Sequence, residues 1–376
     1  QVNGHNGVDF SSPELTEDGV VKVVEELADA GTEVFLPTVV TSSEALYRRN
    51  LPLIKRAVER HGLGMHIPGI HLEGPMITSV GSHEPTLLKE CSAENVRLYD
   101  EISEGFIRVL TLSADAPGAP EAIAEAISLG IVPSAGHHLA HYADIHRAAD
   151  AGCALLTHLG NACPNLLERH DNPLLAGLAE DRMTAMIITD GHHLPADLVK
   201  IILRVKGADR TIVTSDACSL CGLPPGNYRL WGNNAVLTPE GKLWNPEKNC
   251  LVAAARTMRD CMDFLKSLNV LTDEELLKVG RDNPLRLLKI TLLDVCGSNP
   301  VAPTLFSLTQ TFSKAQAGCS AARQWCPAWA SEVGPSPLPG TILSGFCPSR
   351  VFLRKPFNEY LLRRSQCRSA QTSRRS

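Results

Sequence analysis

The amino-acid sequence predicts an α/β fold, a closed barrel of eight parallel strands with a helix after each strand. From residue 1 to 217, short apolar or β-branched runs alternate with longer amphipathic segments, and Gly, Pro, Asp or Ser marks each boundary. The chain has 376 residues and is 44% hydrophobic, so it can bury a large core. A strict strand-then-helix alternation is typical of a parallel sheet, and eight such units predict closure into a barrel.

Seven runs are predicted strands, and Gln1–Val2 is expected to be the stump of a first strand. The seven runs are Glu33–Val40, Gly64–Leu72, Phe106–Ala114, Gly130–Ala135, Ala154–His158, Met183–Thr189 and Arg210–Thr214. Between the first two strands, Thr16–Ala30 repeats Val and Leu at helical spacing among acidic residues. Residues 218–250 break this rhythm and are expected to form a hairpin inserted after the eighth strand. Helical patterning resumes at Leu251–Leu268 and Thr272–Ile290.

The composition changes near residue 297. Residues 1–296 are expected to form the barrel domain, whereas residues 297–376 are rich in Ser, Pro, Ala, Cys and Arg without a clear period. Such a composition predicts a disordered or aberrant tail. The chain also begins at Gln1, inside what reads as a motif, so we expect it to be a fragment.

The charge distribution bears on the class of partner. The net charge is −5, but the tail holds ten Lys/Arg and two Asp/Glu, so residues 1–296 carry a net charge of −13. An acidic body argues against nucleic acid as the ligand. No apolar run approaches the roughly 18 to 20 residues that span a bilayer, and no basic-then-apolar signal opens the chain. We therefore expect a cytoplasmic protein that binds a small molecule and no membrane.

The twelve cysteines are scattered at irregular spacings and are interpreted mainly as buried thiols. Cys218 and Cys221 form a Cys-x-x-Cys pair. Because the sequence has no second cysteine pair at zinc-site spacing, we interpret this pair as part of a packed loop and not as a redox or zinc site.

Polar residues follow the ends of five of the eight predicted strands, and all 13 histidines lie between His5 and His193. The residues at these ends are Glu73, then His137 and His138, then His158, then His192 and His193, and finally Asp216. Any one of them alone is typical of a structural side chain or a helix cap. Because the carboxyl ends of barrel strands meet at one mouth, the whole series predicts a metal site there.

A carboxylate and two imidazoles from different strands supply three ligands to a divalent ion and leave a position open for water, as in catalytic zinc sites. Glu73, His137 and His158 are the candidate ligands. The expected cofactor is one divalent ion, zinc in the first place, with iron, manganese or cobalt as alternatives. Asp216 is the candidate proton acceptor and donor. His193, with His192 as its alternative, is the candidate group for the developing oxyanion.

Eight motifs occur in a fixed order along residues 1 to about 293: QVNGHNGVDF, HLEGP, GSHEP, SAGHH, THLGNACPN, DGHH, TSDA and NPLRLLKI. This ordered set resembles the N-acetylglucosamine-6-phosphate deacetylases of the amidohydrolase superfamily. The resemblance implies a (β/α)₈ TIM barrel whose metal is held by Glu73, His137 and His158. It also implies hydrolysis of the acetamide of an amino sugar to acetate and a free amine, with Asp216 as base and acid. Homo-oligomers are a further implication.

The resemblance implies further contacts to the sugar. His83, Asn161 and Ala162 match positions that touch the substrate in this family, as does His193. Where many amidohydrolases carry His-x-His for a second metal, this chain has Gln1 and Asn3, so one metal is expected. Gln1 and Asn3 are candidate substrate contacts, or else they bond to loop backbone.

One departure concerns the sugar phosphate. Aligned on Pro173, the family's phosphate-gripping Arg corresponds here to Asp171, a carboxylate that would repel a phosphate. Arg169, two residues earlier, is the candidate replacement, whereas Lys206 and Arg210 are interpreted as solvated loop charges. The substrate is therefore expected to be N-acetylglucosamine-6-phosphate or a related, unphosphorylated amino sugar.

Two further departures remain. Ala253 stands where the family tends to have a glycine, which restricts the backbone there. The family's accessory β-sandwich is expected to be missing or incomplete, because residues 297–376 do not resemble it. Two alternatives to the deacetylase stay open: an amidohydrolase of another acylamide or cyclic amide, and a catalytically inactive, sugar-binding paralogue.

Overall fold

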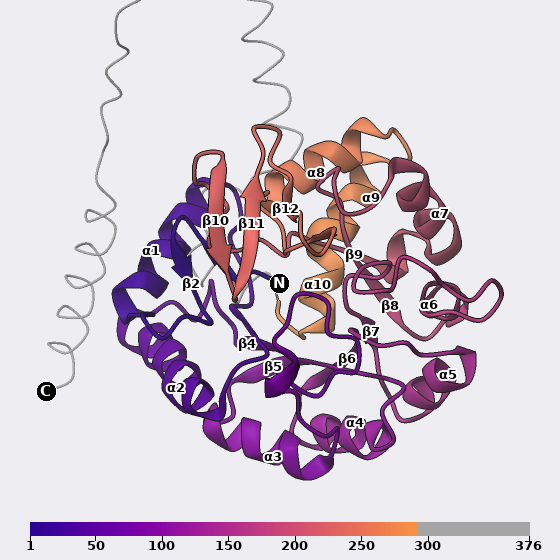
Figure 1. The fold of residues 1–376 in the computed structure, drawn as a ribbon, viewed down its shortest axis with the longest axis horizontal. Helices are drawn as coiled ribbons and strands as arrows, with labels where there is room; N and C mark the ends of the chain where they lie inside the picture. Colours follow the sequence, from indigo (N-terminus) through magenta and orange to yellow (C-terminus); the bar gives the residue numbers. More distant parts are fainter. Residues whose placement is uncertain (292–376) are drawn as a thin grey trace, which may run out of the picture. The chain divides into compact units, whose positions relative to one another are not determined.

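The computed structural model describes residues 1–291, so the predicted domain boundary, the tail and the accessory sandwich lie outside the described residues. Seven parallel strands form one curled sheet in chain order (Figure 1). They are β3 (Thr38–Val40), β4 (Ile70–Glu73), β5 (Ile107–Leu112), β6 (Val132–Ala135), β7 (Leu155–Leu156), β8 (Thr184–Ile188) and β9 (Thr211–Thr214). Each lies within a predicted run or overlaps it closely, and the predicted barrel architecture is confirmed.

The ring closes through a single residue. Val2 forms parallel bridges with Pro37, just before β3, and with Ala217, just after β9. The amide of Thr38 donates to the Val2 carbonyl at 2.8 Å, and the amide of Asn3 donates to the Ala217 carbonyl at 2.7 Å. The predicted first strand is thus reduced to one bridged residue, which nevertheless joins the two ends of the sheet.

Helices cover the outer face of the sheet (Figure 1). They are α1 (Glu17–Asp29), α2 (Glu44–His61), α3 (Ala93–Ile102), α4 (Ala119–Ser128), α5 (Tyr142–Asp150), α6 (Pro173–Ala179), α7 (Ala196–Lys206) and α8 (Met258–Ser267), with short 3-10 helices at Pro85–Leu87 and Ala208–Arg210. In α1 the apolar face predicted from the sequence is buried, and the Thr16 hydroxyl accepts from the Gly19 amide to cap the first turn.

The last helical region is broken into α9 (Asp273–Leu277), a π-helical turn (Lys278–Asp282) and α10 (Asn283–Leu287). The break precedes Pro284, whose missing N–H and bulky ring interrupt regular α-helical bonding. The predicted helix from Leu251 was wrong at its start. Leu251 pairs in a strand, and α8 begins only at Met258.

Residues 218–250, expected to hold a hairpin, fold as an antiparallel sheet beside the barrel mouth (Figure 1). Its strands are β10 (Gly226–Leu230), β11 (Asn233–Leu237), β12 (Leu243–Asn245) and β13 (Cys250–Leu251). A smaller pair, β1 (Gly4–His5) with β2 (Val8–Asp9), lies near the chain start. The larger sheet has its own apolar cluster, which includes Leu230, Leu237 and Leu243.

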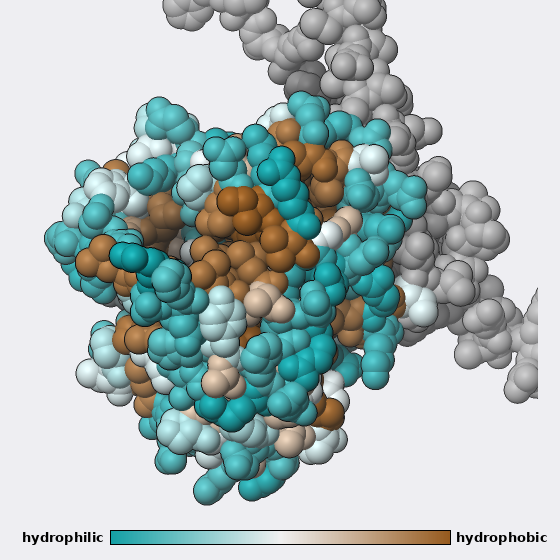
Figure 2. Space-filling model, turned by 90° about the vertical axis from the view of Figure 1, so that its right-hand side faces the viewer, coloured by the Kyte–Doolittle hydropathy of each residue, from teal (hydrophilic) through white to brown (hydrophobic). Residues whose placement is uncertain are grey.

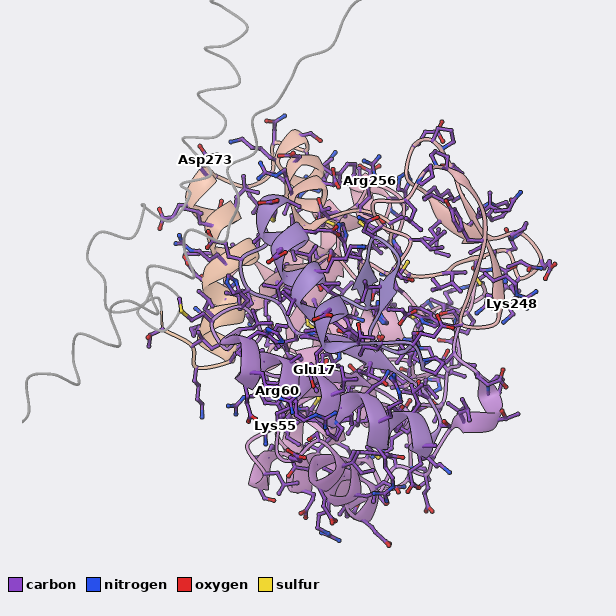
Figure 3. All side chains as sticks on the ribbon, turned by 90° about the vertical axis from the view of Figure 1, so that its left-hand side faces the viewer. Glu17, Lys55, Arg60, Lys248, Arg256 and Asp273 are labelled. Atoms are coloured by element: carbon purple, nitrogen blue, oxygen red, sulfur yellow. The ribbon has the colours of Figure 1, made fainter. Side chains whose placement is uncertain are left out.

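The outer surface carries ion pairs and scattered apolar side chains. Arg60 of α2 pairs with Glu17 of α1 at 3.1 Å, and both are labelled in Figure 3. Figure 2 shows brown side chains gathered on the face toward α6 and α7, where Leu175, Ile201 and Val205 are exposed. The helices described within residues 1–291 include none with the length and apolar character of a membrane-spanning segment.

Lys206 corrects a sequence interpretation. It was expected to be a solvated loop charge, yet it is buried at the end of α7. Its ammonium donates to the carbonyls of Glu180, at 2.6 Å, and Met183, at 3.0 Å. Burial lowers the pKa of the Lys206 ammonium to about 8. A periodic helix ending in Lys does not reveal that its side chain turns inward to satisfy two carbonyls.

Asn283 ties the last described helix to the barrel, and its replacement tests that link. The buried Asn283 amide donates to the carbonyls of Ala208 and Thr211, each at 2.7 Å. Asn283→Ala should lower the free energy of unfolding by about 2–3 kcal/mol, because two inward-facing carbonyls lose their donor. Chemical denaturation measures this loss. Asn227→Ala on the exposed face of β10 is the matched control, and an equal effect of both variants would contradict this role.

Candidate active site

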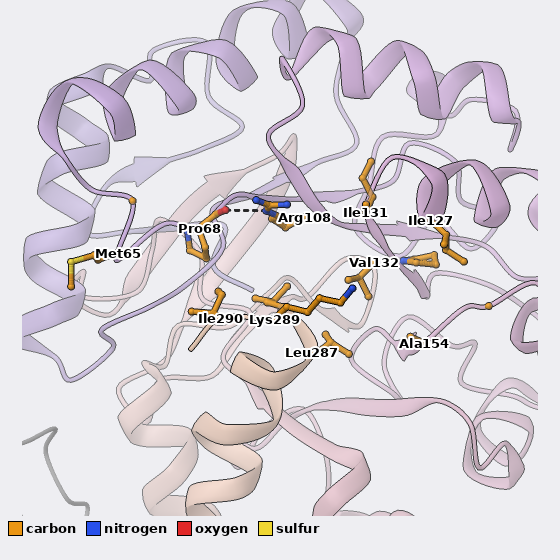
Figure 4. Close-up of a pocket in the computed structure, with 15 residues that line it drawn as sticks. Met65, Pro68, Arg108, Ile127, Ile131, Val132, Ala154, Leu287, Lys289 and Ile290 are labelled. Atoms are coloured by element: carbon orange, nitrogen blue, oxygen red, sulfur yellow. Dashed lines mark hydrogen bonds between the residues drawn. The ribbon is translucent and has the colours of Figure 1, made fainter. Parts of the chain in front are cut away.

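Two cavities open at opposite ends of the barrel. The larger, of about 660 Å³, lies at the amino ends of β5 and β6, with Arg108 and Lys289 among apolar side chains (Figure 4). The Arg108 guanidinium there is bonded to the Pro68 carbonyl at 3.2 Å. The smaller, of about 500 Å³, lies at the carboxyl ends and is lined by Glu73, Asp216 and several histidines. Barrel chemistry resides at the carboxyl ends, so the smaller cavity is the candidate active site.

Glu73, His137 and His158 converge at the floor of this cavity. Glu73 ends β4, whereas His137 and His158 follow β6 and β7. The Glu73 Oε1 atom lies 2.8 Å from His158 Nε2 and 3.3 Å from His137 Nε2, and the two Nε2 atoms are 3.2 Å apart. All three side chains are buried. Three strand ends thus bring one oxygen and two nitrogens to one point.

The spacing of these atoms fits a divalent ion. Donors bound tetrahedrally at roughly 2.0–2.2 Å lie about 3.3–3.6 Å apart, close to the separations seen here. Nδ1 of His137 bonds to the Ser79 carbonyl at 3.0 Å, which leaves its Nε2 free to act as a ligand. Two imidazoles and one carboxylate are a set that zinc binds readily. The buried Glu/His/His group can therefore hold a metal ion.

The pKa values of Glu73 and His158 also fit a site for a cation. Burial raises the pKa of the Glu73 carboxyl, but hydrogen bonds from His137 and His158 outweigh burial and hold the pKa well below its ordinary value. Burial lowers the pKa of the His158 imidazole, but the hydrogen bond to Glu73 and the charges of Glu73 and Asp216 together outweigh burial and raise the pKa above the ordinary value. Positive charge is thus favoured beside the Glu73 carboxylate, as a bound cation requires.

Asp216 follows β9 and lines the same cavity. The Asn3 side-chain amide donates to Asp216 Oδ1 at 2.8 Å, and the Asp216 backbone amide donates to the Gln1 carbonyl at 3.2 Å. Burial, followed by the charge of Glu73, raises the pKa of the Asp216 carboxyl above its ordinary value. Asn3 therefore orients this carboxylate in the cavity, while Gln1 contributes a backbone carbonyl and does not line the cavity.

Several residues of the mouth have a left-handed backbone. The φ angles are +52° at His137, +32° at His158 and +51° at Asp216, each at the turn that leaves its strand. Non-glycine residues rarely adopt such angles, and they cluster where function imposes a constraint. Ala253, where a glycine was expected to be favoured, also has φ +54° and lines the cavity. Its methyl group is accommodated in a conformation that glycine adopts more easily.

The DGHH motif places one of its two histidines in the cavity. His193 is buried there, and its Nδ1 bonds to Asp190 Oδ2 at 2.8 Å. Burial raises the pKa of the Asp190 carboxyl, but the hydrogen bond from His193 and two backbone amides outweigh burial and lower the pKa to about 2. His192 does not line the cavity, and its Nε2 lies 3.1 Å from the Glu240 carbonyl. The structure thus separates the two sequence alternatives.

The expected sugar contacts also divide into two groups. His83, Asn161 and Ala162 line the cavity beside the Glu/His/His group. The His83 and His137 rings meet edge to face with centroids 4.4 Å apart, and burial lowers the pKa of the His83 imidazole to about 3. His83 is therefore a neutral hydrogen-bonding group at neutral pH. Arg169, in contrast, is exposed and does not line the cavity.

Asp171 does not line the cavity either. Its carboxylate accepts from the Tyr142 backbone amide at 2.9 Å and lies 3.3 Å from His141 Nδ1, at the start of α5. The expectation that this carboxylate repels a substrate phosphate directly is not supported by its position. Its contacts instead attach the β7–α6 loop to the start of α5.

Sequence reasoning missed several residues that line this cavity or orient a lining side chain. Asp190 stands in the DGHH motif but was not assigned a role, although an acidic residue three positions before a histidine can orient it. Trp231, Asn249, Cys250 and Leu251 line the cavity from the antiparallel sheet, and no local motif announces them. Only the packing of this sheet over the barrel mouth brings them to the site.

The Cys-x-x-Cys pair has no role here. Cys218 and Cys221 are free and buried, and burial raises the pKa of both thiols, to about 12 for Cys221. Neither thiol lines the cavity. Thiols so far from ionisation at neutral pH are poor nucleophiles and poor metal ligands.

Comparisons with known proteins give consistent findings, although no family model matches the chain. The chain is 30% identical over 305 residues to N-acetylglucosamine-6-phosphate deacetylase of Danio rerio, covering 77% of this chain and 74% of that protein. It is 27% identical over 292 residues to N-acetylgalactosamine-6-phosphate deacetylase of Escherichia coli O157:H7, covering 77% and 76%. A solved N-acetyl-D-glucosamine-6-phosphate deacetylase from Mycobacterium smegmatis, in complex with N-acetyl-D-glucosamine-6-phosphate, aligns with a TM-score of 0.70 at 27% identity, covering 77% and 76%.

The Glu/His/His group predicts one tightly bound divalent ion per chain. Glu73→Gln and His158→Ala should each weaken zinc binding by more than about 100-fold, because each removes one of only three protein ligands. Metal analysis after dialysis and calorimetric titration measure this. His192→Ala, a histidine outside the cavity, is the control and should keep wild-type affinity. Unchanged zinc affinity in both ligand variants would contradict the site.

Proposed function

The chain belongs to the N-acetylglucosamine-6-phosphate deacetylase family of amidohydrolases, and we propose that its barrel mouth hydrolyses the acetamide of an N-acetylated amino sugar. The observation that carries this proposal is the convergence of Glu73, His137 and His158 in the cavity that Asp216 also lines. This arrangement matches the chemical needs of amide hydrolysis, namely an activated water, a proton carrier and a site for negative charge.

Glu73, His137 and His158 are the proposed ligands of the metal ion, and zinc is the proposed ion. Two neutral imidazoles and one carboxylate suit zinc, and three protein ligands leave a position for water or substrate. A bound ion lowers the pKa of a coordinated water toward neutrality and polarises the amide carbonyl. The proton transfers are carried out by cavity residues that do not bind the metal ion.

Asp216 is the proposed base and acid. It takes a proton from the water whose oxygen forms the new bond to the acetyl carbon. It then delivers that proton to the sugar nitrogen as the carbon–nitrogen bond breaks, so that water and the acetamide become acetate and an amine. The bond from Asn3 holds one oxygen of the carboxylate at 2.8 Å and leaves the other available. Burial and the nearby Glu73 raise the pKa of the Asp216 carboxyl, so Asp216 accepts the proton of the water more readily than an ordinary carboxylate does.

His193 is the proposed partner of the acetyl oxygen. Its Nδ1 is engaged by the ionised Asp190, which orients the ring and leaves Nε2 available to the oxygen as negative charge develops. Asp190 is a positioning residue, since it acts through His193. His83, Asn161, Ala162 and Asn3, all of which line the cavity, are the proposed contacts to the sugar side. Arg169, His192 and Gln1 lie outside it and are left out of the proposal.

Three broader expectations remain part of this proposal. A cytoplasmic location is supported by the seven described cysteines, all of which are free thiols. Association into homo-oligomers is proposed on the resemblance to the family alone. The division into a barrel of residues 1–296 and a separate segment 297–376 is supported by the change of composition alone.

Acetate release tests the proposed function. Full-length, zinc-loaded protein should release acetate from N-acetylglucosamine or N-acetylglucosamine-6-phosphate, and removal of zinc with a chelator should abolish the release reversibly. An enzymatic acetate assay measures both. The apoprotein after addition of calcium, which prefers oxygen ligands, is the control and should stay inactive. Zinc-loaded protein that releases acetate from neither sugar would refute the proposal.

Replacement of the proposed base gives a sharper test. Asp216→Asn keeps an acceptor for the Asn3 amide but cannot carry the proton, so kcat should fall by about 10²–10⁴-fold. Zinc affinity should stay within about threefold of wild type, because Asp216 is not among the three proposed ligands. The exposed Asp197→Asn serves as control and should be fully active. Wild-type turnover by the Asp216 variant would overturn this assignment.

A further inference from the structure

One wall of the cavity comes from outside the barrel. Trp231 lines the cavity and lies in the turn that joins β10 and β11. Leu230 pairs with Asn233 across this turn, so Trp231 and Gly232 are its only two residues. Their φ angles, +47° and +77°, are those of the tight hairpin turn in which both central residues are left-handed. Asn and Gly are strongly preferred at the first of these two positions, so a tryptophan at this position is unusual for this turn type.

Such an outlier is informative because the bulky side chain has to be held there by its surroundings. A non-glycine residue at positive φ is strained, and strained residues cluster at ligand-binding sites. A hairpin turn by itself does not need an indole. The feature that distinguishes this turn from an ordinary one is its position, at the edge of the cavity that holds the Glu/His/His group.

The indole is held in one orientation. Its Nε1–H donates to Oδ2 of Asp9 at 2.8 Å. The buried Asn233 amide donates to the Trp231 carbonyl at 3.1 Å and to the Ser82 carbonyl at 3.0 Å, which ties the turn to the loop that carries His83. The side chain is therefore positioned before any ligand arrives, which reduces the entropy lost on binding.

The charges around the cavity bear on what this wall recognises. Among the described residues that line it there is no lysine or arginine, and the ionisable groups are two carboxylates, histidines and the thiols of Cys163 and Cys250. Lys248, labelled in Figure 3, lies next to the lining residue Asn249 but is exposed, and its ammonium donates to Asn233 Oδ1 at 2.7 Å. Arg169 is exposed and also lies outside the lining. Little in this part of the chain can pair with a dianionic phosphate.

We propose that Trp231 is a specificity-determining residue, against which the ring of the acetylated sugar packs. The substrate class is an N-acetylated hexose recognised through its ring and neutral hydrogen bonds, with no requirement for a phosphate. An aromatic surface offers a hexose ring apolar contact, and Asn161, Asn165 and Asn249 in the same lining offer neutral polar groups to its hydroxyls. This inference rests on the proposed function, because it concerns the same site.

Kinetics on three substrates test it with the full-length, zinc-loaded protein. The substrates are N-acetylglucosamine, its 6-phosphate and the ring-free N-acetylethanolamine. Trp231→Leu, which keeps an apolar side chain at the turn, should lower kcat/KM for N-acetylglucosamine by at least about tenfold, mainly through KM. Trp231→Phe should stay within about threefold of wild type, because it keeps an aromatic face.

Two further expectations separate recognition from a structural role. N-acetylethanolamine should be hydrolysed equally well by wild type and Trp231→Leu, because it has no ring to pack. The 6-phosphate should change the wild-type kcat/KM by less than about tenfold in either direction. Trp244→Phe, a tryptophan of β12 outside the lining, is the matched control, and zinc content and thermal midpoint are followed in every variant.

The outcomes are distinct. A Trp231→Leu enzyme as efficient as wild type on N-acetylglucosamine would overturn the inference, as would a loss of equal size on all three substrates. A preference of wild type for the 6-phosphate above about tenfold would overturn the phosphate-free substrate class. Wild-type protein inactive on every substrate would instead refute the proposed function, and this inference with it.

Discussion

The single-residue bridge of Val2 between the two ends of the sheet is the contact on which the site most depends. Val2 lies between the segments that contain Pro37 and Ala217, and this converts an open sheet of seven strands into a ring. The flanking residues are placed by the same contact. The Gln1 carbonyl accepts from the Asp216 amide, and the Asn3 side chain reaches the Asp216 carboxylate. Residues more than 200 positions apart thus orient one another because the ring is closed.

Several residues with a strained, left-handed backbone lie at the mouth of the ring. His137, His158 and Asp216 each leave a strand through a left-handed conformation that ordinary residues avoid. A regular continuation of the strands would carry these side chains elsewhere, so the packed barrel compensates for the local cost. Ala253 and Trp231 also line the cavity and also have positive φ angles, so the surrounding packing compensates for backbone strain there as well.

The charges of the mouth form a second constraint. Glu73 and Asp216 bring two carboxylates into a buried volume, and this arrangement is unfavourable unless positive charge accompanies them. The buried Glu/His/His group can hold a divalent ion that supplies this charge, whereas a lysine or arginine is absent from the described lining. A site balanced in this way suits a substrate whose reacting group is neutral, as an acetamide is.

The sequence by itself determined the barrel and the residues at its strand ends, because the alternation of strands and helices fixes which side chains follow each strand. The ordered motifs added the family, which the comparisons with known proteins confirmed. Hydrophobic periodicity is a local property, and it is legible along each run without knowledge of distant partners. For the same reason, Glu73, His137, His158 and Asp216 could be singled out together before any contact between them was known.

Only the tertiary structure decided which neighbour in a motif faces the cavity. The sequence alone does not distinguish His192 from His193, but the hydrogen bond to Asp190 orients His193 toward the cavity. Arg169 and Asp171, judged by alignment, were expected to act on a phosphate, yet neither lines the cavity. Trp231 reaches the site because a separate sheet folds over the barrel mouth. Such choices depend on packing between segments distant in the chain, and local patterns carry no record of that packing.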